Sequence, residues 1–345
     1  MTGLADVRDA HRFDIPALER HLAQHVSEFQ GPATVRQFRG GQSNPTYLLD
    51  TPGRKYVLRR KPPGTLLPSA HAVEREYRII TALARTEVPV PATYLLCEDP
   101  AVIGTPFYLM DYVEGRVVRD AALPGFDPAE RAAVYDSLNG VLASLHRVDW
   151  QAVGLDGFGK PGNYFARQIH RWTSQYRASE TERIESMERL IAWLPSHIPP
   201  DDATSVVHGD YRMGNMLIHP SEPRVVAVLD WELSTLGHPL GDLAYNCLAW
   251  RLGEDLEGLA GQDVARLGIP SEEAYVARYC ARTDRAGIRE WEFYIAFAAF
   301  RLAAIWQGVI GRALAGTAND PNALQHRARA HTLADVAWAT AARGS

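Results

Sequence analysis

The spacing of apolar residues changes repeatedly along the first third of the chain. Residues 14–28 carry apolar side chains at helical spacing behind an Asp, which predicts an amphipathic helix. Residues 33–61 form short alternating runs broken by Gly-rich and Pro-Gly turns, which predicts three strands. Helical spacing returns over residues 69–86, with Ser69 as the expected N-cap, and two further strands are expected within 93–113. The pattern therefore predicts a five-stranded antiparallel sheet interrupted by one helix.

Helical spacing dominates the remainder. Helices are expected over residues 127–148, 163–179, 180–194 and 292–310, and a short β segment at 205–230 interrupts them. The first of these helices is expected to have Asp127 as its N-cap and Pro128 at its first position. No internal repeat or low-complexity segment is present.

This change of pattern predicts an α+β chain with two lobes. A small antiparallel β lobe with one helix is expected over residues 1–110, preceded by the N-terminal helix, and a hinge over 111–116. A larger, mainly helical lobe is expected over 117–345.

Composition narrows the class of protein. The net charge of −5 is spread without a block of like charge, which argues against a nucleic-acid partner. The start of the chain has no apolar targeting segment, and no apolar run approaches the length of a membrane span, so we expect a cytoplasmic protein without a membrane partner. Cys97, Cys247 and Cys280 lack CxxC spacing and a nearby His cluster, which favours buried thiols over a zinc site.

Two acids and an amide stand out in the β segment. The stretch "VVHGDYRMGN" places Asp210 at the end of a strand and Asn215 five positions later, and the next strand, "RVVAVLD", ends in Asp230. This is the spacing of a kinase catalytic loop, in which the Asp accepts the proton of the substrate hydroxyl and the Asn binds magnesium. Asp230 is placed as the second magnesium ligand, because Mg²⁺ prefers hard oxygen donors. Either acid alone could simply cap a turn, but the three residues together indicate phosphoryl transfer.

A Gly-rich turn between the first strands offers groups for binding phosphate. In "FRGGQSNPTYLL", the backbone N–H groups and side chains of Gly40, Gly41, Ser43 and Asn44 could cover the phosphates of a nucleotide. A plain hairpin turn would look the same. The stretch does not match the Walker P-loop pattern.

A cation for the α- and β-phosphates is expected on the next strand, "KYVLRRK". Arg59 occupies the place where a protein kinase carries lysine, and its guanidinium can bind phosphate oxygens; Lys61 is the alternative on the same strand face. The following helix offers Glu76, or less favourably Glu74, as a partner for that cation.

The strand in "FYLMDYVEGR" leaves the sheet and turns at Gly115, as a hinge would. Met110 is expected at the back of an adenine pocket. Backbone groups of Asp111 and Val113 are expected to face the purine edge.

With these parts in order, the chain resembles the aminoglycoside phosphotransferase/choline kinase-like family, which has a protein-kinase-like fold. Within that family it is most similar to a subgroup that also occurs as the kinase-like domain fused to certain acyl-CoA dehydrogenases. The resemblance covers residues 30–310. It rests on "GGQSNPTYLL", "YVLRRKPPGTLLPSAHAVEREYRII", "GFGKPGNYFARQIHRWTSQY", "HGDYRMGNMLIH" and "LDWELSTLGHPLGDLAYN".

The resemblance implies a role for each matching residue. Asp210 would be the catalytic base, Asn215 and Asp230 the magnesium ligands, and Arg59 the phosphate contact held by Glu76. His208 would brace the catalytic loop, and Asp242 would anchor that loop or a helix N-terminus by hydrogen bonds. The resemblance further implies an ATP- and Mg²⁺-dependent transfer of the γ-phosphate to a small hydroxylated acceptor, with GTP left open as the donor.

Two features bear on the class of acceptor: an Arg- and aromatic-rich stretch and the fused relatives. Residues 163–179 are either a packed helix with aromatics in the core or a platform for an anionic, partly apolar substrate. The fused relatives imply a hydroxyacyl-CoA or a hydroxy acid and a functional link to an acyl-CoA dehydrogenase. An aminoglycoside or other amino-alcohol acceptor, and a nucleotide-binding pseudokinase module, remain the alternatives.

Overall fold

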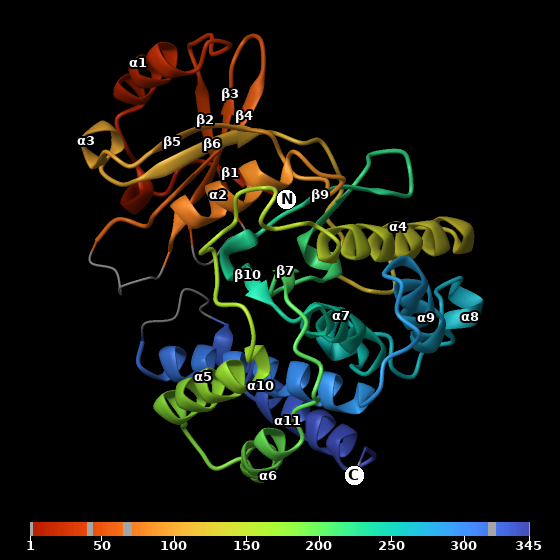
Figure 1. The fold of residues 1–345 in the computed structure, drawn as a ribbon. Coiled ribbons are helices and arrows are strands. Elements are labelled where there is room, and N and C mark those ends of the chain that lie inside the picture. Colours follow the sequence, from red (N-terminus) through yellow and green to blue (C-terminus); the bar gives the residue numbers. More distant parts are fainter. Residues whose placement is uncertain (1–2, 40–43, 65–70, 317–321, 345) are drawn as a thin grey trace. The chain divides into compact units, whose positions relative to one another are not determined.

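The computed structural model describes residues 3–39, 44–64, 71–316 and 322–344. It divides the chain into two compact units (Figure 1). The first unit consists of Met1–Val117, Gln151–Leu155 and Asn215–Ser234, and the second of Val118–Trp150, Asp156–Gly214 and Thr235–Ser345. The first boundary, after Val117, follows the expected hinge at 111–116. The chain then returns to the first unit at 151–155 and 215–234, and the prediction of two consecutive lobes did not include this return.

A six-stranded antiparallel sheet forms the centre of the first unit (Figure 1). Its order is β1 (Leu4–Ala5), β2 (Thr34–Phe38), β3 (Thr46–Asp50), β4 (Lys55–Arg60), β6 (Phe107–Asp111) and β5 (Thr93–Cys97). The five predicted strands are all present. The sequence did not indicate β1, because two residues carry no measurable alternation.

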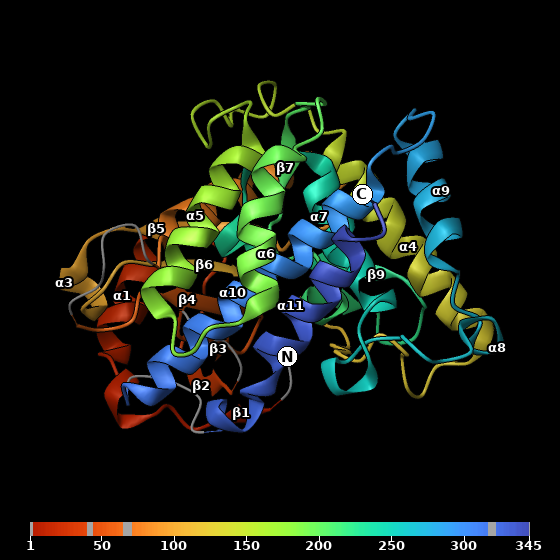
Figure 2. The same ribbon diagram turned by 90° about the horizontal axis from the view of Figure 1, so that it is seen from below.

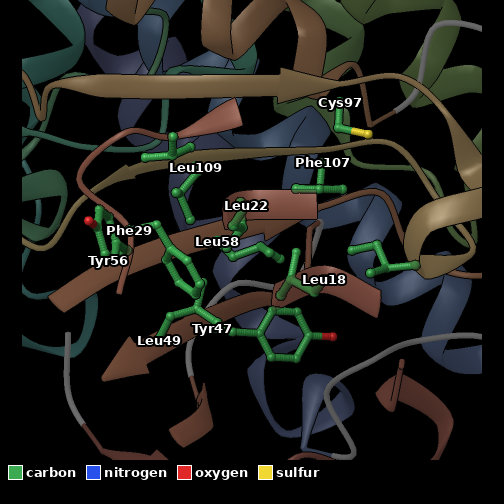
Figure 3. Close-up of a cluster of buried hydrophobic side chains, with 12 residues drawn as sticks. Leu18, Leu22, Phe29, Tyr47, Leu49, Tyr56, Leu58, Cys97, Phe107 and Leu109 are labelled. Carbon is green, nitrogen blue, oxygen red and sulfur yellow. The ribbon is translucent and has the colours of Figure 1, made fainter. Parts of the chain in front are cut away.

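One face of this sheet is covered by α1 (Ile15–His25), which begins behind Asp14. The Asp14 side chain accepts a hydrogen bond from the amide of Ala17, as an N-cap does. Leu18 and Leu22 of α1 point into an apolar cluster with alternate strand residues (Figure 3). The strand residues of this cluster are Tyr47, Leu49, Tyr56, Leu58, Cys97, Phe107 and Leu109.

The opposite face of the sheet packs against α2 (Val73–Leu83). This helix begins at Val73 with Ala72 as its N-cap. The expected cap, Ser69, lies outside the described residues, and the helix starts later than predicted. Because side chains alternate along a strand, the residues that face α2 are the neighbours of those in the α1 cluster.

A hairpin from later in the chain completes the first unit. It consists of β8 (Met216–Ile218) and β9 (Val225–Val228), which pair antiparallel. Val228 donates to the carbonyl of Pro89, 2.9 Å away. Arg116 forms a β-bridge to Ile218 directly after Gly115. A Cβ on Gly115 would lie only 2.9 Å from the Ile218 carbonyl, which explains the glycine at this position.

The second unit is mainly helical (Figure 2). Its helices are α4 (Pro128–His146), α5 (Tyr164–Ser179), α6 (Glu185–Trp193), α7 (Pro239–Cys247), α8 (Val264–Leu267), α9 (Glu272–Arg282), α10 (Trp291–Leu314) and α11 (Ala328–Ala341). A two-stranded ladder, β7 (Ser205–Val207) with β10 (Thr235–Gly237), accompanies them. The predicted cap of α4 is confirmed: Asp127 and Glu130 form a capping box, with Pro128 in the first turn.

The helix α10 is the longest in the second unit, and it packs against α5, α7 and α11. Within the described residues it is the one helix long and apolar enough to cross a membrane, with a mean hydropathy of 1.6 over its most apolar window. However, 72% of that window is buried inside the protein, as in the core helix of a globular domain. Two polar residues, Arg301 and Gln307, interrupt its apolar sequence, and both are buried.

Candidate active site

Arg59 is the centre of a charged cluster in the first unit. It lies on β4, on the face of the sheet that packs against α2, and its side chain is almost fully buried. Its Nε lies 2.8 Å from Glu76 on α2, and its Nη2 lies 2.8 Å from Asp230. Glu232 lies 3.5 Å from the same guanidinium. Burial lowers the pKa of Arg59, but the carboxylates of Glu76 and Asp230 outweigh it, so that the pKa lies well above its usual value.

Glu76 is held by neutral donors as well as by Arg59. The side-chain amide of Asn44 donates to one carboxylate oxygen at 2.7 Å, and the Tyr108 hydroxyl donates to the other at 3.2 Å. Tyr108 is the cross-strand partner of Arg59 on β6. Arg59, Asn44 and Tyr108 therefore all contact the carboxylate of Glu76, and such contacts compensate a charge in an apolar interior.

The alternative cation, Lys61, has a different partner. It follows the last residue of β4, and its Nζ lies 2.9 Å from Glu74. Its side chain is more exposed than that of Arg59. The geometry thus places Arg59 with Glu76, and Lys61 with the acid that was the less favoured partner.

The Gly-rich turn is described only in part. Gly40, Gly41 and Ser43 lie outside the described residues, and their predicted phosphate contacts stay predictions. Asn44 is described, and its fully buried side chain is hydrogen-bonded to Glu76 and to His71. In this structure the Asn44 side chain orients Glu76, and the predicted phosphate contact of Asn44 stays a prediction.

The expected hinge lies at the end of β6. Met110 is buried and pairs in the sheet with Val57 and Thr93. The amide of Asp111 donates to the carbonyl of Ala92 at 2.8 Å, so this N–H is used within the sheet. The backbone group of Asp111 that remains for the predicted purine contact is its carbonyl. Val113 follows the strand and is partly exposed.

The two expected magnesium ligands flank one end of the β8–β9 hairpin. Asn215 immediately precedes β8, Asp230 follows β9 by two residues, and Leu229 donates to the Asn215 carbonyl at 2.9 Å. Asp230 has a left-handed backbone with φ of 66°. No group of three or more His, Cys, Asp or Glu side chains in the described parts of the chain is placed to hold a metal. The pair fits Mg²⁺, which uses few protein oxygens and takes the rest from water and phosphate.

In the second unit, Asp210 lies in a loop fixed by hydrogen bonds. Its amide donates to His208 Nδ1 at 3.1 Å, which confirms that His208 braces the loop. Its carboxylate lies 3.4 Å from the Nε of Arg212, and the Tyr245 hydroxyl hydrogen-bonds to it. Gly209, with φ of 84°, supplies the left-handed turn before it.

Asp242 anchors this loop. Its buried carboxylate accepts from the amides of His208 and Gly209, at 2.5 and 2.8 Å. His146 lies on the other side, with Nε2 3.5 Å from Asp242 and Nδ1 2.7 Å from the Tyr279 hydroxyl. Burial lowers the pKa of His146, which favours the neutral ring. The prediction that Asp242 anchors the loop that holds Asp210 is confirmed.

The aromatic residues of the stretch 163–179 face the core. Tyr164, Phe165, Trp172 and Tyr176 are buried in α5, so the packed-helix interpretation holds for them. Two of its arginines are used structurally, because Arg167 donates to carbonyls of residues 160 and 162 and Arg177 pairs with Glu188 and Glu180. Arg171 is exposed and lies over the Trp172 ring.

Sequence reasoning did not single out Arg212, Tyr245 or Arg301 as site residues. Arg301 donates to the carbonyl of Gly209, next to Asp210. One signal was available: a single Arg within the apolar run of residues 292–310 needs a buried partner.

The two candidate cations can be separated by mutation. We expect Arg59→Ala to weaken ATP binding about 10- to 100-fold, because a hydrogen bond to a charged group contributes roughly 1.5–3 kcal/mol. Lys61→Ala should change it less than about 3-fold, since Lys61 is paired with Glu74 near the surface. Calorimetric titration of both variants, below their unfolding temperatures, measures this. Stronger weakening by Lys61→Ala would reverse the assignment.

Residues 34–294 match the model of the phosphotransferase enzyme family. Among solved structures, a protein from Ralstonia eutropha JMP134, provisionally described as an aminoglycoside phosphotransferase, is 53% identical with a TM-score of 0.89; the match covers 96% of this chain and 99% of that one. The aminoglycoside phosphotransferase APH(4)-Ia, bound to AMP-PNP and hygromycin B, is 17% identical with a TM-score of 0.62, over 94% of this chain and 98% of that one. The predicted α+β kinase-like fold is confirmed.

The curated relatives are longer than this chain. Acyl-CoA dehydrogenase family member 10 of Mus musculus is 51% identical over 326 residues, which is 93% of this chain and 30% of the relative. This chain spans 30% to 42% of the length of the curated relatives that it matches. The match therefore concerns the kinase-like region of those proteins.

Proposed function

This chain belongs to the phosphotransferase enzyme family, and from that premise we propose that it transfers the γ-phosphate of ATP, with Mg²⁺, to a hydroxyl of a small anionic acceptor. A hydroxyacyl-CoA or a hydroxy acid is the acceptor class we propose. The observation that carries the proposal is the pair of arginines, Arg212 and Arg119, at the loop that holds Asp210.

Each group has one task in this proposal. Asp210 accepts the proton of the acceptor hydroxyl and orients its oxygen, while Arg59, held by Glu76, contacts the nucleotide phosphates. Asn215 and Asp230 would hold Mg²⁺, which neutralises phosphate charge when bound. Because phosphoryl transfer has a loose transition state, most of the catalysis comes from positioning and charge, and these residues supply both.

Two arginines of the second unit lie at the loop that holds Asp210. Arg212 lies 3.4 Å from its carboxylate and is half-exposed. A Cβ on Gly214 would lie 3.2 Å from Arg212 and 3.5 Å from Arg119, so both side chains approach the end of the loop. A polycationic aminoglycoside would be repelled by these guanidinium groups, whereas a carboxylate or a phosphorylated acyl carrier would be attracted.

The relatives support the same acceptor class. Several are named as acyl-CoA dehydrogenases, and this chain matches their kinase-like region. A phosphotransferase fused to an acyl-CoA dehydrogenase would act on a substrate of related chemistry. This supports a hydroxyacyl-CoA acceptor and a functional link to such a dehydrogenase.

An ADP-release assay with Mg-ATP and a panel of acceptors tests the proposal. The panel contains hydroxyacyl-CoAs, free hydroxy acids, aminoglycosides, choline and homoserine. We expect release with a hydroxyacyl-CoA or a hydroxy acid, and a KM that rises with ionic strength, because arginines attract the acceptor. Turnover of an amino-sugar without affinity for any CoA thioester would overturn the acceptor class.

The aminoglycoside alternative keeps one specific support, the description of the Ralstonia eutropha relative. The same assay decides between the two. A nucleotide-binding module without chemistry would instead bind ATP and release no ADP with any acceptor.

A further inference from the structure

Arg301 carries a positive charge into the core of the second unit. It lies near the middle of α10, and only 5% of the residue is exposed. Its guanidinium carbon lies 5.3 Å from the ring centre of Trp172 on α5 and 5.3 Å from that of Tyr245 on α7. Its Nη2 donates to the carbonyl of Gly209. Three helices and the catalytic loop therefore meet at this side chain.

The charge of Arg301 is balanced without an acid. Among the described residues, no carboxylate lies within 4.0 Å of its guanidinium. A buried charge is costly unless something compensates it. Two aromatic faces and one carbonyl do so here, and the flat guanidinium suits them because it stacks on rings while donating in its own plane.

Both the N–H groups and the last carbonyl of the turn before Asp210 are hydrogen-bonded. Asp242 accepts the amides of His208 and Gly209, so a carboxylate fixes the N–H groups of this turn. Arg301 fixes the carbonyl that leads directly into Asp210. An anion and a cation thus bind opposite polar groups of the same short turn. Rotation of the Gly209–Asp210 peptide would break the Arg301 bond.

We infer that Arg301, held between Trp172 and Tyr245, is a positioning residue that sets the direction of the Asp210 carboxylate. The inference rests on the proposed function only in taking Asp210 as the base. Arg301 acts through the peptide and does not touch the acceptor, because its side chain is buried. Through its contact with Arg301, Trp172 connects the stretch 163–179 to the catalytic loop, in addition to packing in the core.

The kinetic test compares Arg301→Gln and Arg301→Lys with Arg312→Gln, a control at an exposed position of the same helix. We expect kcat per nucleotide-binding molecule to fall at least about 10-fold in Arg301→Gln, with the KM for ATP within about 2-fold. Arg301→Lys should recover part of kcat, because an ammonium can still donate to the carbonyl. Calorimetric stoichiometry with ATP counts the folded molecules, so loss of folded protein does not imitate the effect.

Hydrogen exchange supplies a second readout that needs no acceptor. In Arg301→Gln, amides of a peptide spanning residues 205–214 should exchange at least about 10-fold faster, while peptides of α4 and α9 stay within about 2-fold of wild type. Unchanged exchange of the loop, or an unchanged kcat, would overturn the inference. If wild type turns over no acceptor, the proposed function fails, and the exchange result alone decides whether Arg301 holds the loop.

Discussion

Asp210→Asn is expected to lower kcat for acceptor phosphorylation by about 10²- to 10⁴-fold, the usual contribution of a positioned general base. An amide of the same shape cannot accept the proton of the acceptor hydroxyl. The loop should keep its form, because Asp242 and Arg301 bind its main chain and not the Asp210 side chain. ATP affinity should therefore stay within about 2-fold. Coupled ADP release and calorimetric titration measure the two quantities.

The matched control for this substitution is Asp284→Asn. Asp284 is exposed and has a left-handed backbone with φ of 55°, which asparagine adopts readily. Its variant should retain wild-type kcat. If Asp210→Asn kept more than about a tenth of wild-type kcat, Asp210 would not be the base, and the role would pass to another group near the acceptor hydroxyl.

Glu76→Gln is expected to reduce the free energy of unfolding by about 3 kcal/mol, because removal of one partner of a buried ion pair leaves an uncompensated charge. Arg59 would keep Asp230 beside it, which places the loss at the lower end of the usual range for such pairs. The substitution also replaces one of the two carboxylate oxygens, to which Asn44 and Tyr108 respectively donate, by an NH₂ group that cannot accept. Urea denaturation of the variant and wild type gives the difference.

Glu74→Gln provides the control two residues away on the same helix. Glu74 pairs with Lys61, and both side chains are partly exposed. Pairs of this kind contribute about 0–1 kcal/mol, so the loss should stay below about 1 kcal/mol. Equal losses in the two variants would mean that the cluster around Arg59 is not the buried centre of the first unit. ATP binding should also weaken in Glu76→Gln alone, because the orientation of Arg59 depends on Glu76.

The sequence predicted the local parts of the molecule well. Alternation along β4 placed Arg59 on one strand face, and the structure pairs it with Glu76, the partner favoured from the sequence. The cap at Asp127 was also predictable, because an N-cap Asp before a Pro leaves a recognisable pattern, whereas the anchoring role of Asp242 followed from the family resemblance.

The parts that escaped prediction depend on contacts between distant segments. Arg59 and Asp230 are 171 positions apart, and Arg301 and Gly209 are 92 apart. A single sequence contains no pattern that brings such positions together. The contact of Asn44 with Glu76 was not predicted for the same reason, because the acid lies 32 positions away on α2.

The return of the chain to the first unit has a practical consequence for recombination with relatives. A gene fragment ending at residue 117 would encode the six-stranded sheet without the hairpin of residues 215–234. Arg59 would then lack Asp230, and the carbonyl of Pro89 would lack its donor from Val228. A chimaera that exchanges residues 1–117 should therefore exchange 215–234 from the same parent. The two segments 1–117 and 215–234 must come from one parent together. A chimaera with a single junction between them would take Arg59 from one parent and Asp230 from the other.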